Sequence, residues 1–372
     1  MSNDSASGIA PAGNFMVGMD ATETSDDGSL SMTELYLSGR ESRLFWSQPG
    51  VLPHCGAESL PSCGAQASPY LTDYLACGPA ELELCSIPHD YVPHVLQAQA
   101  RGICDEHGLS MPIEVLVAHA PARRSGKKLH SAVFPKGVAP AQFVEYAEGL
   151  YLASPELTLL QAAESCTLHE LALLCSTYMA VYESSPDGSG IAFRQQLTSR
   201  ERLAAFARDS KGAKHAEKLL AACGLAFEGA ASPYEIYIAA LFAWPTRAGG
   251  YGLGAAQLNK AIDTSGFFED GGTHYRLCDC YFDELKTSIE YDGRSAHQRR
   301  SEQGEDQMRH NELAAAGVTE YLITTETLHS TRYLDSIALA VGKLHGLHRR
   351  SLGPSFRKRQ NALVRALRSI VC

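Results

Sequence analysis

Residues Tyr275 to Gly293 read YRLCDCYFDELKTSIEYDG, and this stretch decides how the C-terminal part of the chain folds. Its apolar, aromatic and β-branched residues predict two strands, over residues 274–283 and 286–292. Glu284 and Leu285 alone separate the two strands, which favours a β-hairpin with a two-residue loop.

The hairpin register sets the positions of three carboxylates. A loop at residues 284–285 places Asp279 opposite Glu290, with Cβ atoms about 4.5–5.5 Å apart. Strand alternation puts Asp292 on the same face as Glu290. Opposed like charges destabilise a sheet, so a hard divalent cation such as Mg²⁺ is expected to neutralise the patch. The alternative is an exposed acidic hairpin with ordinary surface carboxylates, and a one-residue slip of register would disperse the cluster.

The hairpin belongs to a predicted α/β unit over residues 230–342. Ser232 and Glu235 form a capping box for a helix that runs to about residue 244. A second helix over residues 298–316 ends at Gly317. A strand over residues 319–324 and a helix over 331–344 complete the order helix–β–β–α–β–α.

The same residues resemble a known family. In order, they are Ser232-Pro-x-Glu235, Asp279, Glu290-Tyr-Asp292-Gly293, His297, Asp306-x-x-Arg309, Leu313 and Gly317. This combination resembles the endonuclease-like domain related to very-short-patch-repair endonucleases, within the PD-(D/E)xK superfamily. The resemblance covers about residues 230–330 and implies a restriction-endonuclease-like fold, a mixed sheet flanked by helices.

The resemblance also implies roles for the acidic residues. Asp279 and Glu290 would bind Mg²⁺ or Mn²⁺, and Asp292 would stand where other superfamily members have lysine. Cys278 precedes Asp279 where the superfamily motif has proline. The missing lysine leaves the group that activates the nucleophile unidentified.

Three further residues surround these acids in the resemblance. Glu235 would reach the site from the first helix, although its place in a capping box explains it equally well. His297 would act as a general acid or base, or would be an exposed loop residue. Arg309 would hold a phosphate, or would pair with Asp306 on one helix face.

The charge of the chain is unevenly distributed. Its net charge is −10, yet residues 343–372 contain eight Lys or Arg and no acid. Such a basic end on an acidic body favours phosphate contacts, and the alternative is a solvated surface helix. The residues expected to contact DNA here are Arg349, Arg350, Arg357, Lys358 and Arg359.

The N-terminal part is predicted as a disordered leader over residues 1–31 and an α+β domain over 32–226. Two strands over residues 113–120 and 129–135 are expected to form a hairpin with a basic tip at 123–128. Helices are expected to begin at Ser154-Pro-Glu and at Thr198-x-x-Glu201. The run from Tyr151 to Gln161 resembles the middle region of AbiE-type (type IV) antitoxins.

Composition limits the class of protein. With 45% hydrophobic and 20% charged residues, the chain is neither disordered nor collagen-like. No run of 18 apolar residues or secretory signal occurs, and eleven cysteines, an odd number, exclude a complete disulfide framework. We therefore expect a cytoplasmic, non-membrane protein.

Three functions fit these observations. The first is a Mg²⁺-dependent DNA endonuclease in bacterial repair or defence. The second is a non-cleaving, antitoxin-like DNA-binding regulator that uses a nuclease-like domain, with a protein partner on the N-terminal domain. The third is a protein-interaction module, against which the basic C-terminal segment argues.

Overall fold

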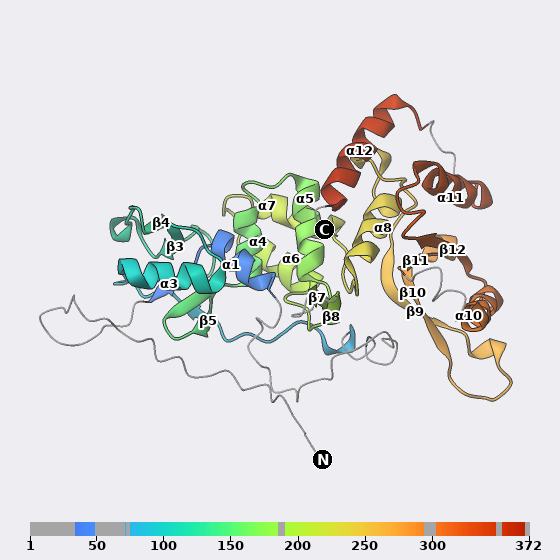
Figure 1. Ribbon diagram of the computed structural model, residues 1–372, viewed down its shortest axis with the longest axis horizontal. Coiled ribbons are helices and arrows are strands. Elements are labelled where there is room, and N and C mark those ends of the chain that lie inside the picture. The colour runs from blue at the N-terminus through green and yellow to red at the C-terminus, as the bar shows by residue number, and fades with distance from the viewer. Residues whose placement is uncertain are drawn as a thin grey trace, which may run out of the picture. The chain divides into compact units, whose positions relative to one another are not determined.

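The computed structural model describes residues 34–48, 71, 75–184, 190–293, 303–346 and 352–368. The leader predicted over residues 1–31 lies outside these ranges. From Glu34 onward the chain forms one compact unit (Figure 1). It is a mixed α/β protein, as the sequence predicted.

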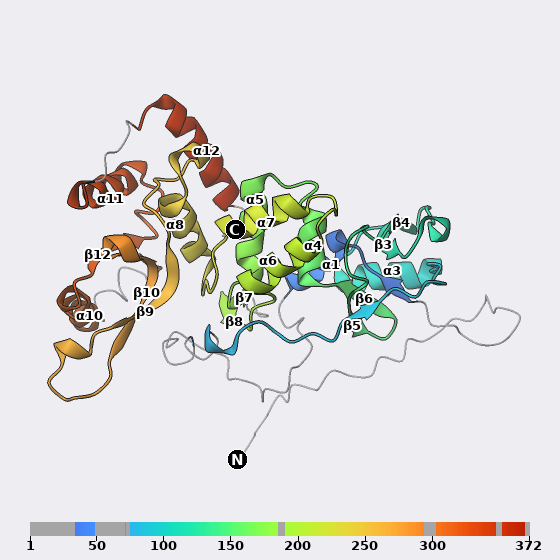
Figure 2. The same ribbon diagram turned by 180° about the vertical axis from the view of Figure 1, so that it is seen from behind.

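A mixed sheet lies in the N-terminal part, and its strands run in the order β1-β6-β5-β2. These strands are β1 (Leu35–Tyr36), β2 (Cys85–Ser86), β5 (Ala141–Ala147) and β6 (Leu150–Ala153). Helices α1 (Gly39–Trp46) and α3 (Gln97–His107) belong to the same region (Figure 2). The indole of Trp46 donates to the carbonyl of Ala153 at 2.9 Å, which joins α1 to the edge of β6.

The predicted basic-tipped hairpin is wrong. Strands β3 (Ile113–Val117) and β4 (Leu129–Val133) pair in parallel. The connection contains a 3₁₀ turn at Ala120–Ala122 and a local bridge between Ser125 and His130. It is therefore long enough to bring the chain back to the start of β3, where the second strand can run in the same direction.

A group of helices follows this sheet along the chain. They are α4 (Pro155–Ala162), α5 (Leu168–Tyr178), α6 (Arg200–Asp209) and α7 (Ala216–Leu225), with the short hairpin β7 (Tyr182–Ser184) and β8 (Ile191–Phe193) inserted after α5. Ser154 caps α4 as predicted, accepting from the Leu157 amide at 3.1 Å. The capping box predicted at Thr198 is wrong. Ser199 caps α6 instead, because the Thr198 hydroxyl donates to buried Glu156 at 2.6 Å.

The C-terminal part is built on a second mixed sheet, in the order β12-β11-β10-β9. Its elements are α8 (Pro233–Ala243), β9 (Gln257–Asp263), β10 (Tyr275–Phe282), β11 (Thr287–Asp292), α10 (Gln303–Ala315), β12 (Thr319–Thr324) and α11 (Thr331–Leu344). Strands β9, β10 and β11 are antiparallel neighbours, and β12 runs parallel to β11. The sequence predicted every one of these elements except β9.

The predicted hairpin register is confirmed, although its loop differs. Tyr281 pairs with Ser288 and Phe282 with Thr287, which is the predicted alignment. The loop contains a 3₁₀ turn at Asp283–Leu285, followed by Lys286 at φ 43°. A two-residue hairpin loop usually needs positive φ at one or both of its residues. The longer loop needs a positive φ only at Lys286.

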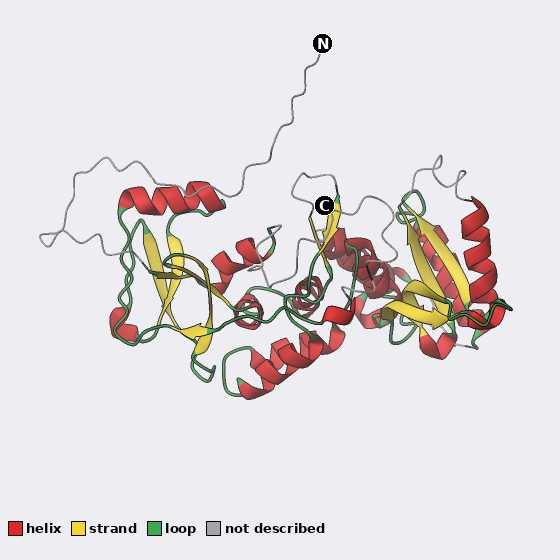
Figure 3. Cartoon of the chain, turned by 90° about the horizontal axis from the view of Figure 1, so that it is seen from below, coloured by secondary structure: helices red, strands yellow, loops and turns green. Residues whose placement is uncertain are grey.

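Helices pack on both faces of this sheet (Figure 3). Helix α8 contacts β10 and β11, and Val341 of α11 shares the main hydrophobic core with Ile289 and Ile323. Leu313 of α10 belongs to a separate small core with Cys278, Tyr281 and Val318. The two distinct cores show that α10 covers the opposite face from α8 and α11.

The basic C-terminal segment contains helix α12 (Pro354–Arg368), which packs against α8. Its buried face consists of Phe356, Gln360, Leu363 and Leu367. A Cβ atom at Gly249 would lie 2.6 Å from the Arg359 carbonyl oxygen, so only glycine permits this approach. None of the helices in the described part of the chain combines the length and apolar character needed to cross a membrane.

Candidate active site

Asp279 and Glu290 meet across the hairpin. The Asp279 amide donates to both carboxylate oxygens of Glu290, at 3.3 and 3.4 Å. In return, the amide of Tyr291 donates to Oδ2 of Asp279 at 2.9 Å. Side-chain to backbone bonds thus join β10 and β11 at this point, and the two acids lie side by side.

The environment of this pair favours retention of a proton. Glu290 is 4% exposed. Burial raises the pKa of both carboxyl groups, and the nearby charge of Asp279 raises that of Glu290 further, to about 8. Two carboxylates this close cannot both ionise without a compensating cation.

Arg309 supplies positive charge from α10. Its guanidinium forms an ion pair with Glu290 and donates to the Leu277 carbonyl at 2.9 Å. Its Nε lies 3.4 Å from Glu320 on β12. The Ser288 hydroxyl also donates to Glu290. These contacts join Arg309 to β10, β11 and β12, while its pairing with Asp306, one of the two alternatives from sequence, stays a prediction.

Glu235 lies beside the pair, at the start of α8. Its carboxylate accepts from the Ala231 amide at 2.8 Å, the Ser232 hydroxyl at 2.9 Å and the Asn259 amide group at 2.6 Å. Burial and the charge of Asp279 raise the pKa of Glu235 to about 8. The predicted capping box explains part of this geometry, and the contact with Asn259 ties Glu235 to the sheet.

Asn259 marks an irregularity in β9 beside the site. It has φ 48°, and the flanking pairs Cys278–Lys260 and Cys280–Leu258 place it opposite Asp279. Its side chain also donates to the Gly229 carbonyl at 2.8 Å. Asn is among the residues that adopt positive φ most readily, so this irregularity requires little strain.

The predicted convergence of three carboxylates does not occur. Asp292 is buried at the end of β11, with 5% exposure. Within the described ranges, no three His, Cys, Asp or Glu side chains are grouped closely enough to hold a metal ion together. Arg309 and Ser288 contact Glu290, where the sequence analysis expected a third acid.

The donor chemistry of the remaining pair still fits a hard divalent cation. Mg²⁺ is commonly bound by one or two carboxylates and completes its shell with water and phosphate oxygens. Around Arg309 stand the carboxyl groups of Asp279, Glu290 and Glu320, all of which raise its pKa. Acids therefore outnumber cations among these residues, and Asp279 and Glu290 could supply two ligands.

Two tyrosines stack next to the acids. The rings of Tyr234 and Tyr291 are 4.3 Å apart between centroids, with an interplanar angle of 15°. Each directly adjoins an acid in the sequence, Glu235 and Glu290, and each is half-buried. The stack joins the start of α8 to β11 on the face of the strand opposite to Glu290.

The other residues predicted at the site have varied outcomes. His297, Arg349 and Arg350 lie outside the described residues. Arg357, expected to contact DNA, forms an ion pair with Asp335 of α11. Arg359 donates from Nε to the Thr246 carbonyl at 3.0 Å, and Lys358 is exposed.

Sequence reasoning missed Asn259, Ser288 and Glu320. Asn259 lies on the strand that the sequence analysis did not predict. Ser288 carries the one signal that could have found it, since it is two residues before Glu290 and so shares its strand face. Glu320 lies in a correctly predicted strand, but its contact with Arg309 depends on how α10 packs.

Comparison of the chain with protein-family models, curated proteins and solved structures yields no match. The resemblance to very-short-patch-repair-type endonucleases therefore depends on the ordered residues themselves.

Proposed function

We propose that this protein is a divalent-metal-dependent DNA endonuclease with its active site at Asp279 and Glu290. The observation that carries the proposal is the pair of facing carboxyl groups on the adjacent strands β10 and β11, with Glu290 buried and Asp279 half-buried. The fold around them supports a restriction-endonuclease-like assignment, since a mixed sheet has a helix before it and helices on both faces.

Asp279 and Glu290 would hold Mg²⁺ or Mn²⁺. A bound cation of this kind lowers the pKa of its water and stabilises negative charge on a phosphate. Glu235 and Asn259 hold the β9 side of the site in place through their 2.6 Å contact. Arg309 is positioned to pair with a phosphate, because the cation would take over part of its charge balance at Glu290.

The exposed basic residues of α12 offer sequence-independent phosphate contacts. Lys358, Arg365 and Arg368 are exposed. Binding through such residues releases counterions, so DNA affinity should fall steeply with added salt. Arg357 contributes less to this surface because Asp335 already pairs with it.

The test is cleavage of supercoiled and linear DNA with Mg²⁺ or Mn²⁺. Asp279→Asn and Glu290→Gln should each lower the cleavage rate at least about 100-fold, since loss of even an outer partner of a metal ligand costs 10–100-fold. Glu284→Gln is the matched control, because Glu284 lies in the same hairpin with its side chain exposed. Equal cleavage by all four proteins would reject the assignment of the site.

A non-cleaving DNA-binding regulator is the second candidate. The ion pair between Arg309 and Glu290 favours it, because a protein cation already occupies the position next to one proposed metal ligand. It predicts salt-sensitive DNA binding without cleavage, unchanged in Asp279→Asn. The same cleavage and binding assays separate the two candidates.

A further inference from the structure

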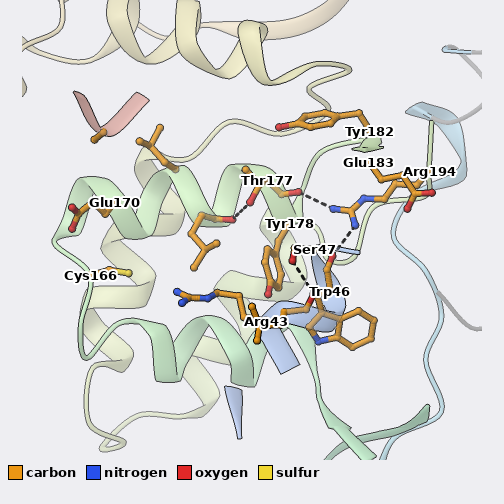
Figure 4. Close-up of a pocket in the computed structure, with 14 residues that line it drawn as sticks. Arg43, Trp46, Ser47, Cys166, Glu170, Thr177, Tyr178, Tyr182, Glu183 and Arg194 are labelled. Atoms are coloured by element: carbon orange, nitrogen blue, oxygen red, sulfur yellow. Dashed lines mark hydrogen bonds between the residues drawn. The ribbon is translucent and has the colours of Figure 1, made fainter. Parts of the chain in front are cut away.

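A cavity in the N-terminal part lies apart from the carboxylate site. Its volume is about 420 Å³, within the range typical of small-molecule sites. It is lined by residues of α1, α5 and the β7–β8 region (Figure 4), together with Ala366 of α12. Neither the proposed nuclease activity nor the proposed DNA contacts use any of these residues.

Two buried donors in this cavity lack partners. Tyr178 is 3% exposed, and its hydroxyl has no hydrogen-bond partner among the described residues. The Nε of Arg194 is likewise buried without a partner in the described part of the chain. The other nitrogens of Arg194 donate to the carbonyls of Trp46 at 3.2 Å and Thr177 at 3.0 Å, which fixes the guanidinium in place. Unsatisfied buried donors are costly, and a ligand with acceptor atoms would satisfy them.

The charge at this end of the cavity is positive. Burial raises the pKa of Tyr178, and the charges of Arg194 and Arg43 partly oppose this rise. Both arginines line the cavity. Figure 4 shows the Tyr178 ring directed toward Arg43. Neither arginine forms an ion pair with a carboxylate at contact distance within the ranges that the structure describes.

Two acids also line the cavity. Burial lowers the pKa of Arg194, and the charge of Glu183 partly opposes this shift. Glu170 completes the capping box of α5, in which its carboxylate accepts from the amide of the N-cap residue Thr167 at 2.7 Å. It lies at the opposite end of the cavity from Arg194 (Figure 4). Figure 4 shows Arg43 and Arg194 on either side of Tyr178, so positive charge flanks its ring within the cavity.

The rest of the lining is largely apolar and includes Trp46, Leu173 and Leu174. We propose that this cavity binds a small amphipathic anion, whose carboxylate or phosphate group contacts Arg43, Tyr178 and Arg194 while an aromatic or aliphatic body fills the apolar part. Charge-assisted hydrogen bonds to guanidinium groups give such sites their strength and orientation.

Calorimetric titration of the full chain with phenyl phosphate and with benzoate tests the proposal, and comparison of the two shows which anionic group is preferred. Arg43→Gln and Tyr178→Phe should each weaken binding, Arg43→Gln by about tenfold or more. Arg40→Gln is the matched control. Arg40 lies on the same helix but pairs with Glu114 at 2.9 Å and is largely exposed.

Thermal unfolding without ligand shows whether a variant that binds the anion less tightly is still folded. Tyr178→Phe should unfold at a higher temperature than the wild type while binding the anion less tightly, which an unfolded or damaged variant would not do. Three outcomes would overturn the proposal. They are absence of binding by both anions at millimolar concentration, equal affinity in Arg43→Gln and wild type, or equally tight binding of neutral benzyl alcohol.

Discussion

The C-terminal sheet buries acidic groups and the N-terminal cavity buries hydrogen-bond donors, and the two regions differ in whether these groups have partners. Around Asp279 and Glu290, acids predominate, and other parts of the chain satisfy them through Ser288 and Arg309. Around Tyr178 and Arg194, donors predominate, and two of them have no partner among the described residues. Glu290 thus has partners within the protein, and the metal ion that we propose would join them. The buried donors beside the cavity have none among the described residues, and the anion that we propose would supply one.

The largest effect on stability should come from removing the cation of the acidic cluster. Arg309→Met would leave Glu290 and Glu320 without their shared partner. Breaking a fully buried pair costs about 3–5 kcal/mol, and the one-third exposure of Arg309 reduces this to about 2–3 kcal/mol. Urea unfolding of the metal-free protein above pH 8, where Glu290 is ionised, measures the loss.

A second substitution checks the cause of that loss. In the Arg309→Met background, Glu290→Gln removes the unpaired charge and should restore about half of the lost stability or more. If the double variant is as unstable as the sum of the two single variants, the guanidinium packs as a side chain and does not balance charge.

The acidic cluster should also make stability depend on pH. The pKa of Glu235 and Glu290 is raised to about 8 in the folded chain, against about 4.5 for an unperturbed glutamate. Between these values the folded state holds protons that the unfolded state has released, so stability falls as pH rises from about 5 to 8. Urea unfolding at a series of pH values, with a chelator present, should show this fall in stability.

Glu290→Gln should flatten this profile, with Glu235 and Asp279 responsible for the slope that remains. Glu284→Gln should leave the profile unchanged, because its carboxyl group is exposed in the hairpin loop. A profile that rises across this pH range in the wild type would contradict the raised pKa values.

The sequence predicted the acidic cluster better than its surroundings. The register that joins Asp279 to Glu290 follows from local pairing, and the structure has it. Strand β9 was missed because QLNKAID mixes polar and apolar residues without clear alternation. With β9 unrecognised, the position of Asn259 opposite Asp279 could not be predicted.

The residues of the cavity could not be predicted from the sequence, for a different reason. Arg43, Tyr178 and Arg194 come from α1, α5 and the end of β8, and no local pattern relates them. Only tertiary packing brings them together. The same applies to β3 and β4, where the strands were predicted but their parallel direction depends on the path of the connection.

The smallest expected effect concerns two tyrosine hydroxyls, each of which is removed by substitution of the tyrosine with phenylalanine. Tyr251 donates to Asp335 at 2.7 Å, so Tyr251→Phe should lower the free energy of unfolding by about 1 kcal/mol. Tyr178 has an unpartnered hydroxyl among the described residues, so Tyr178→Phe should raise it by about the same amount. Urea unfolding without ligand measures both. If both substitutions destabilise the protein equally, the Tyr178 hydroxyl has a hydrogen-bond partner in the unliganded protein. The cavity would then leave no hydroxyl donor for a ligand to satisfy, and its contrast with the acidic cluster would fail.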